Sequence, residues 1–220
     1  FNQTQELDNF IVPDTCIVTM DDIWKLYKNR FPKNIDVYFV NTLEETELEK
    51  EVSKFINYKM IIGFGGGQAL DIAKYFSWKC NLKLFQFPTS ISVDAVFGHR
   101  SGIRRDGNVN YIGWAIPECV FLDYEIIQSA PKIYNYSGIG DVLCFYTGVL
   151  DWQYANKQNK CEEKWSYKSE LANKSLEYVE DLLLNTENIK EMNEEGINAI
   201  IRAHQWGGNS FFSSGWNPRH

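Results

Sequence analysis

The segment with the clearest chemical potential is a run of glycines between an apolar stretch and an amphipathic one. Residues 61–71 read Ile-Ile-Gly-Phe-Gly-Gly-Gly-Gln-Ala-Leu-Asp, with the triple glycine at Gly65, Gly66 and Gly67. Glycines let backbone N–H groups approach an anion, and a helix N-terminus adds partial positive charge, so this pattern can bind a phosphate. It is not the Rossmann dinucleotide fingerprint, since Gln68 stands at the third glycine position, and it lacks the Lys-Ser/Thr ending of a P-loop. A plain tight turn is the alternative.

A second polar cluster follows another short apolar stretch. Residues 87–94 read Phe-Pro-Thr-Ser-Ile-Ser-Val-Asp, so the hydroxyls of Thr89, Ser90 and Ser92 precede the carboxylate of Asp94. Open α/β sheets carry ligand-binding loops at the carboxyl ends of their strands, where such groups can bind a nicotinamide amide, a ribose or a substrate hydroxyl. The competing interpretation is a loop whose hydroxyls bond to its own backbone.

One carboxylate and three histidines are the candidate metal ligands. Asp141 ends the segment Gly138-Ile139-Gly140-Asp141 at a predicted helix start, where it serves either as an N-cap or as a ligand. Together with His204 and His220 it could form a two-histidine, one-carboxylate site. His204 lies in an apolar helical stretch, however, so we expect it to be a packed or surface residue; the third histidine is His99.

Alternating strand and helix patterns must position these residues in the first half of the chain. Strands are predicted over 37–41, 59–64, 84–87 and 119–122, and helices over 44–55 and 69–78. A loop or hairpin region is predicted over 93–116, with a turn at Arg-Arg-Asp-Gly-Asn, residues 104–108. This alternation predicts a Rossmann-like α/β domain, with a parallel sheet, over 1–137. Residues 131–140 are interpreted as a joint, and helical patterns over 143–154, 165–184 and 189–206 predict an incomplete all-helical domain over 138–220.

The composition excludes several classes of protein. The 220 residues are 44% hydrophobic, which suffices for a packed core, and their net charge of −7 argues against nucleic acid or an anionic membrane as partner. The apolar runs fall far short of the roughly eighteen residues that a membrane span needs. The five cysteines form no C-x-x-C pair, which predicts free thiols and a cytoplasmic location. The triplet Asn135-Tyr136-Ser137 is interpreted as a chance match to the glycosylation signal.

Taken in order, these segments resemble the sn-glycerol-1-phosphate dehydrogenase family, within the superfamily of dehydroquinate synthases and iron-containing alcohol dehydrogenases. The matching stretches are GFGGGQALDIAK at 63–74, PTSISVD at 88–94, DYEIIQSAP at 123–131, GIGDVL at 138–143 and DW at 151–152. Several ordered motifs are more specific than one glycine turn. They favour a binding role for these segments over the tight turn, the self-bonded loop and the N-cap.

The resemblance implies a cofactor role for several of these residues. Gly65, Gly66, Gly67 and Asp71 would hold the pyrophosphate and ribose of NAD or NADP. Thr89 and Ser92 would contact the nicotinamide half.

It also implies a substrate and metal site. Asp94 would bind a substrate hydroxyl, and Asp141 would be the catalytic carboxylate, binding both substrate and a divalent metal that is zinc in most relatives. Such a metal acts as a Lewis acid that stabilises the developing alkoxide while hydride passes to or from the nicotinamide.

Two departures from the family pattern stand out. Gly98 replaces a usual serine and is followed by His99-Arg100, where Arg100 could meet a phosphate. Residues 215–220, Gly-Trp-Asn-Pro-Arg-His, resemble the start of the segment that precedes the first metal-binding histidine. On that alignment neither histidine ligand is present, and a catalytic zinc needs three protein ligands. We therefore expect the chain to be part of a longer protein.

The leading expectation is reduction of a small, phosphorylated ketone, such as dihydroxyacetone phosphate, with NAD(P)H. The alternatives are a sugar-phosphate cyclase resembling dehydroquinate synthase, although Gly98-His99-Arg100 does not supply the Gly-Gly-Lys typical of those enzymes, and a nucleotide-binding remnant without catalysis. The expected partner is a small-molecule substrate, and a homo-oligomer is left open.

Overall fold

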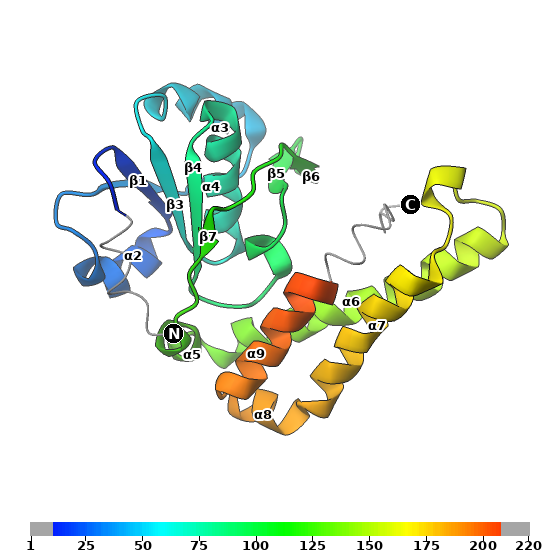
Figure 1. Ribbon diagram of the computed structural model, residues 1–220. Coiled ribbons are helices and arrows are strands. Elements are labelled where there is room, and N and C mark those ends of the chain that lie inside the picture. Colours follow the sequence, from blue (N-terminus) through cyan, green and yellow to red (C-terminus); the bar gives the residue numbers. More distant parts are fainter. Residues whose placement is uncertain (1–10, 208–220) are drawn as a thin grey trace. The chain divides into compact units, whose positions relative to one another are not determined.

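The computed structural model describes residues 11–207, which fall into two compact units (Figure 1). The first unit comprises Phe1–Ser90 and Gly98–Ser129, and the second comprises Ile91–Phe97 and Ala130–His220. The short segment 91–97, which carries Ser92 and Asp94, therefore belongs with the helical half of the chain. Residue 137, where the sequence analysis sets the domain boundary, lies inside a long helix.

The first unit is built on a parallel sheet, as predicted, with five strands, one more than the sequence predicts. Its strand order is β2-β1-β3-β4-β7, and all four pairings are parallel. The strands are β1 (Thr15–Thr19), β2 (Asp36–Phe39), β3 (Met60–Gly65), β4 (Lys83–Pro88) and β7 (Cys119–Val120). Because β2 lies on one side of β1 and β3 on the other, the direction of winding reverses there, at the point where open α/β sheets bind ligands.

Side chains alternate between the two faces of this sheet, and each face has its own core. Cys16 and Ile61 join the core that includes Leu48 of α3 (Glu45–Glu51) and Phe76 of α4 (Gly67–Cys80). The neighbouring Ile17 joins the opposite core, which contacts α2 (Asp21–Tyr27) and α5 (Tyr124–Ser129). Helices on both faces bury β1, β3 and all but the first residue of β4, which explains why these central strands are mainly apolar.

The predicted hairpin is also present in the first unit. Strands β5 (Ser101–Arg105) and β6 (Asn108–Ile112) pair in antiparallel fashion, with Arg105 opposite Asn108. The two linking residues, Asp106 and Gly107, have φ angles of 52° and 75°. A two-residue turn with two positive φ angles matches the twist of the flanking strands, and Asp-Gly is a preferred sequence for it.

The described part of the second unit is helical. It contains α6 (Lys132–Lys157), α7 (Ser169–Leu184), α8 (Thr186–Glu191) and α9 (Glu194–Arg202), followed by a π-helical turn, Ala203–Gly207. Helix α6 packs against α7, and α7 packs against α9 and the π-helical turn. Short 3₁₀ turns lie at Asp94–Val96 and Glu163–Trp165 in this unit, and at Lys28–Arg30 and Val52–Lys54 in the first unit.

The prediction of a joint over 131–140 is wrong. Helix α6 begins directly after Pro131 and continues through Gly138 and Gly140. A glycine inside a helix costs about 1 kcal/mol relative to alanine, which is why the pair was interpreted as a break. Here tertiary contacts outweigh that cost, because a Cβ at Gly138 would lie 2.0 Å from the carbonyl oxygen of Ile91. Asp141 is consequently in mid-helix, and its interpretation as an N-cap is also wrong.

Among the residues 11–207, no helix combines the length and the apolar character required to cross a membrane.

Candidate functional site

The glycine turn joins the carboxyl end of β3 to the N-terminus of α4. Gly65 has a φ of 152°, and a Cβ at this position would lie 2.9 Å from that of Ala69. Both the backbone angle and the close approach of α4 therefore require glycine. The N-cap residue of α4, Gly66, has no side chain that could cap the first turn. The leading N–H groups of α4, together with the helix dipole, can accordingly receive an anion.

The hydroxyl-bearing segment begins directly beside this turn. Pro88 is opposite Gly65 in the β3–β4 register, and the backbone N–H of Thr89 donates to the carbonyl oxygen of Gly65 at 3.0 Å. Ser90 Oγ would lie 3.8 Å from a Cβ at Gly66. The glycine turn and the start of the hydroxyl-bearing segment, residues 88–90, therefore lie side by side.

Asp71 is held by a buried lysine one turn further along α4. Lys74 Nζ lies 2.7 Å from the Asp71 carboxylate and donates to the carbonyl oxygens of Arg100 at 2.8 Å and Gly98 at 3.2 Å. Burial raises the pKa of Asp71, while Lys74 and the backbone N–H of Gly102 oppose that shift. These contacts tie α4 to the start of the β5–β6 hairpin. The assignment of Asp71 to a ribose stays a prediction.

In the second unit, the two predicted aspartates are in contact. The backbone N–H of Asp94 donates to Oδ2 of Asp141 at 2.8 Å. Both side chains are partly exposed. Ser92, two residues before Asp94, accepts a long hydrogen bond of 3.4 Å on its carbonyl oxygen from Ser137 of α6.

Asn135 and Gly138 belong to the same cluster and were not identified as site residues from the sequence. Asn135 is fully buried, and its Oδ1 accepts the backbone N–H of Ile91 at 3.0 Å. Gly138 admits the carbonyl of Ile91, as described above. Their spacing could have indicated a shared role. Asn135, Gly138 and Asp141 follow one another at intervals of three residues, which places them on one face of a helix.

His204 lies behind this face of α6. It is buried, with Nε2 at 3.1 Å from the carbonyl oxygen of Gly138 and at 3.7 Å from Asp141 Oδ2. Burial lowers the pKa of His204, although the charge of Asp141 and the Gly138 carbonyl oppose that effect. A neutral ring that donates from Nε2 to Gly138 satisfies this geometry. The expectation of a packed histidine is confirmed, whereas His220 lies outside the described residues.

The described residues do not by themselves fit a catalytic metal. Over 11–207 no group of three or more His, Cys, Asp or Glu side chains is placed to hold a metal ion. Asp141 contributes one carboxylate, and Nε2 of His204 faces a carbonyl oxygen. Three protein ligands are the ordinary minimum for a catalytic zinc, and the described residues supply fewer. The metal-binding role of Asp141 stays a prediction.

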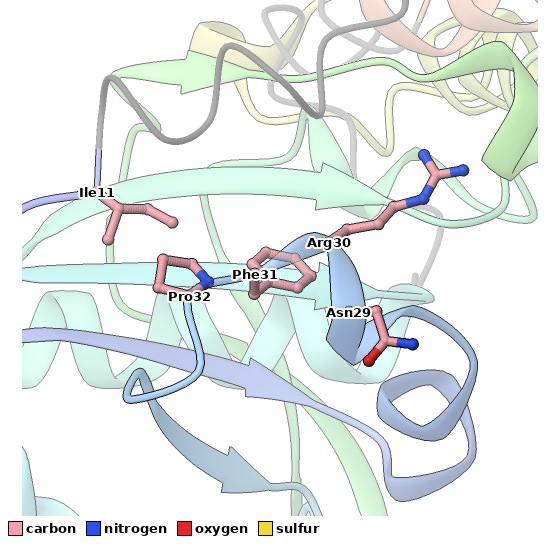
Figure 2. A pocket seen from close by; sticks show the side chains of 5 residues that line it. All are labelled: Ile11, Asn29, Arg30, Phe31 and Pro32. Carbon is pink, nitrogen blue, oxygen red and sulfur yellow. The ribbon is translucent and has the colours of Figure 1, made fainter.

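A surface hollow elsewhere on the first unit has no part in this cluster (Figure 2). It is lined by Ile11, Asn29, Arg30, Phe31 and Pro32. None of the predicted site residues is among them. The partly exposed Arg30 pairs with the buried carboxylate of Asp123 at 3.3 Å. That carboxylate also accepts the N–H of Ile126 and caps α5.

The parallel sheet, the reversal of winding beside β1 and the glycine turn after β3 define a doubly wound α/β protein of the kind that binds ligands at this edge of the sheet. The chain belongs to the iron-containing alcohol dehydrogenase family, whose sequence model matches residues 15–131.

Curated relatives at about 30% identity are glycerol-1-phosphate dehydrogenases [NAD(P)+] of archaea. The protein of Pyrococcus furiosus is 29% identical over 192 residues, which are 87% of this chain and 54% of the relative. That of Thermococcus kodakarensis is 32% identical over 163 residues, which are 74% of this chain and 45% of the relative. The chain thus spans about half the length of the curated relatives it matches.

Solved structures share the fold at lower identity. Glycerol dehydrogenase from Schizosaccharomyces pombe superposes with a TM-score of 0.70 at 20% identity, covering 94% of this chain and 57% of that one. Sulfoacetaldehyde reductase from Bifidobacterium kashiwanohense, solved in complex with NAD+, superposes with a TM-score of 0.65 at 15% identity, covering 94% and 61% respectively.

Proposed function

We propose that this chain is part of an NAD(P)H-dependent dehydrogenase that reduces a small, phosphorylated ketone such as dihydroxyacetone phosphate. The observation that carries the proposal is the hydrogen bond between Asp94 and Asp141, since it joins the two segments expected to bind substrate. The names of the curated relatives support both the substrate class and the cofactor.

The cofactor half of the proposal rests on the glycine turn. Gly65, Gly66 and Gly67 bind the pyrophosphate through backbone N–H groups at the uncapped start of α4. Thr89, hydrogen-bonded to Gly65, and Ser92 contact the nicotinamide half. With a net charge of −7, the chain draws its affinity for an anionic cofactor from these local dipoles.

The substrate half assigns the carboxylate of Asp94 to a substrate hydroxyl. A reduced nicotinamide bound there would supply a hydride to the carbonyl carbon, and the carbonyl oxygen would take up a proton to give the alcohol. Asp141 is proposed as the catalytic carboxylate and as one ligand of a divalent metal, zinc, with the remaining ligands outside residues 11–207. We place the protein in the cytoplasm, in keeping with its five free cysteines.

The test uses the full natural length of the protein with NADH or NADPH, zinc and a panel of ketones. Oxidation of the cofactor with dihydroxyacetone phosphate, and a much lower kcat/KM with unphosphorylated dihydroxyacetone, is the expected result. Release of inorganic phosphate from a sugar phosphate without net cofactor oxidation would favour the cyclase. Cofactor binding without turnover on any ketone would favour the remnant.

A further inference from the structure

The loop 91–97, which carries Asp94, is attached to α6 at its first residue, Ile91, and at Asp94 itself. At its start the Ile91 N–H donates to Asn135 Oδ1 at 3.0 Å, and at Asp94 the backbone N–H donates to Asp141 Oδ2 at 2.8 Å. Between them Gly138 lets the helix approach the Ile91 carbonyl closely. Gly138 and Asp141 follow Asn135 by three and six residues along α6, so one face of one helix makes all three contacts.

Of these groups, Asn135 is the one that no catalytic or binding role already explains. It is fully buried in the first turn of α6, and its Oδ1 accepts a backbone N–H from the loop. A buried backbone N–H left without an acceptor is costly, so the position of Ile91 depends strongly on this side chain.

We propose that Asn135 is a positioning residue that fixes the loop 91–97 on α6 and so sets where the carboxylate of Asp94 stands. The inference concerns the loop and rests on the proposed function only for its catalytic consequence. Asp94 opens a single 3₁₀ turn, Asp94–Val96, closed by the bond from Phe97 N–H to the Asp94 carbonyl oxygen. Ile91 lies three residues before Asp94. Fixing the position of Ile91 therefore also fixes the backbone that leads into the turn carrying the Asp94 carboxylate.

Hydrogen exchange tests this directly, residue by residue, on the full-length protein. In Asn135→Leu, which is similar in size but has no acceptor, the Ile91 amide should exchange at least about tenfold faster and the Asp94 amide should also lose protection. Asn135→Asp keeps an acceptor oxygen and should restore most of the protection. Thr147→Ala removes an exposed hydroxyl whose hydrogen bond stays within the same helix, on the Cys144 carbonyl, and should leave both amides unchanged.

Three results would overturn the proposal. One is unchanged exchange of Ile91 and Asp94 in a folded Asn135→Leu protein. Another is an equal loss of protection throughout α7 and α9, which indicates general destabilisation only. If Asn135→Leu does not fold, Gly138→Ala carries the test, since its methyl group must displace the Ile91 carbonyl while Asn135 is intact. Unchanged exchange of both amides in Gly138→Ala would then contradict the proposal.

Enzyme kinetics measure how the position of the loop affects catalysis. They also separate the proposed role of Asn135 from the proposed reductase function. If the protein reduces ketones, Asn135→Leu should lower kcat/KM for the ketone by at least about tenfold. Asn135→Asp should recover a large part of that loss. A protein without ketone reductase activity would contradict the proposed function, but the exchange result would still decide the role of Asn135.

Discussion

The carboxylate of Asp141 accepts the backbone N–H of Asp94 at 2.8 Å, although 47 positions separate the two residues. The bond means that a carboxylate expected to bind metal also holds the loop expected to bind substrate. Substitutions at Asp141 should therefore have two separable effects, one on the loop and one on the chemistry.

The effect on the loop is expected to depend on whether an acceptor remains at position 141. In Asp141→Ala the Asp94 amide should exchange about tenfold to a hundredfold faster, because a hydrogen bond to a charged acceptor is worth about 1.5–3 kcal/mol. In Asp141→Asn an amide oxygen can still accept, so the Asp94 amide should stay largely protected. Hydrogen exchange followed by NMR or by mass spectrometry measures the exchange rate of the Asp94 amide in each variant. Equal rates in Asp141→Ala and Asp141→Asn would contradict a role for the Asp94–Asp141 hydrogen bond.

The glycine turn should respond to a single methyl group. Gly65→Ala meets both a positive φ and a 2.9 Å contact with the Cβ of Ala69, so we expect a loss of about 2–3 kcal/mol in the free energy of unfolding and weaker NADH binding. Gly107→Ala is the matched control, since it also has a positive φ but has no heavy atom within 4 Å of the added Cβ. It should cost about 1 kcal/mol and leave NADH binding unchanged. Urea denaturation measures the free energy of unfolding, and fluorescence titration measures the affinity for NADH. Equal NADH affinity in Gly65→Ala and Gly107→Ala would argue against cofactor binding at the glycine turn.

The buried pair of Asp71 and Lys74 allows a test of the ribose assignment. Lys74→Met leaves a largely buried carboxylate without its cation and should lower the free energy of unfolding by about 3–5 kcal/mol. The double variant Asp71→Asn with Lys74→Met should regain most of that loss, because no unpaired charge is left. If Asp71 also binds the cofactor, the double variant will be stable yet will bind NADH at least about tenfold more weakly. Unaltered NADH affinity in the double variant would limit Asp71 to a structural role.

Cys16 predicts a specific dependence of stability on pH. Burial raises the pKa of this thiol from 9.0 to about 12, with the charge of Asp36 adding to the shift. Between these two values the unfolded thiol ionises while the folded thiol stays protonated, so the unfolded state binds fewer protons and the free energy of unfolding falls as pH rises. The slope approaches about 1.4 kcal/mol per pH unit from this group.

Comparison with Cys16→Ala isolates that contribution. The variant loses packing at every pH, so the informative quantity is the difference in slope between the two proteins above pH 9, measured by urea denaturation in the presence of a reductant. Parallel curves for the two proteins would show that Cys16 ionises normally in the folded state.

Local patterns were sufficient to predict most of the first unit. The alternation of apolar runs predicted the parallel sheet, and Asp106-Gly107 predicted the hairpin, because each depends on residues close in sequence. Strand β1 was missed although Thr15–Thr19 is rich in β-branched residues. It is central in the sheet only because β2 and β3 pair with it, and no feature near residue 15 carries that information.

In the second unit, the predictions failed where a contact with a residue distant in sequence determines the role of a residue. Gly138 and Gly140 were interpreted as helix breakers by their intrinsic propensity, but α6 continues through them, and at Gly138 the contact with Ile91 explains the glycine. Asn135 was noticed only as part of a glycosylation triplet. Its actual partner is 44 positions away, and a contact at that separation has no signature in the residues beside it.

The most direct test of the proposed reductase is the oxidation of NADH by the full-length protein with zinc and dihydroxyacetone phosphate, measured side by side for the wild type and Asp141→Asn. We predict turnover by the wild type and at least about a hundredfold lower kcat/KM in the variant, with its fold and its Asp94 amide protection retained. Wild-type protein that binds NADH but oxidises none, or an Asp141→Asn variant with undiminished turnover, would contradict this account.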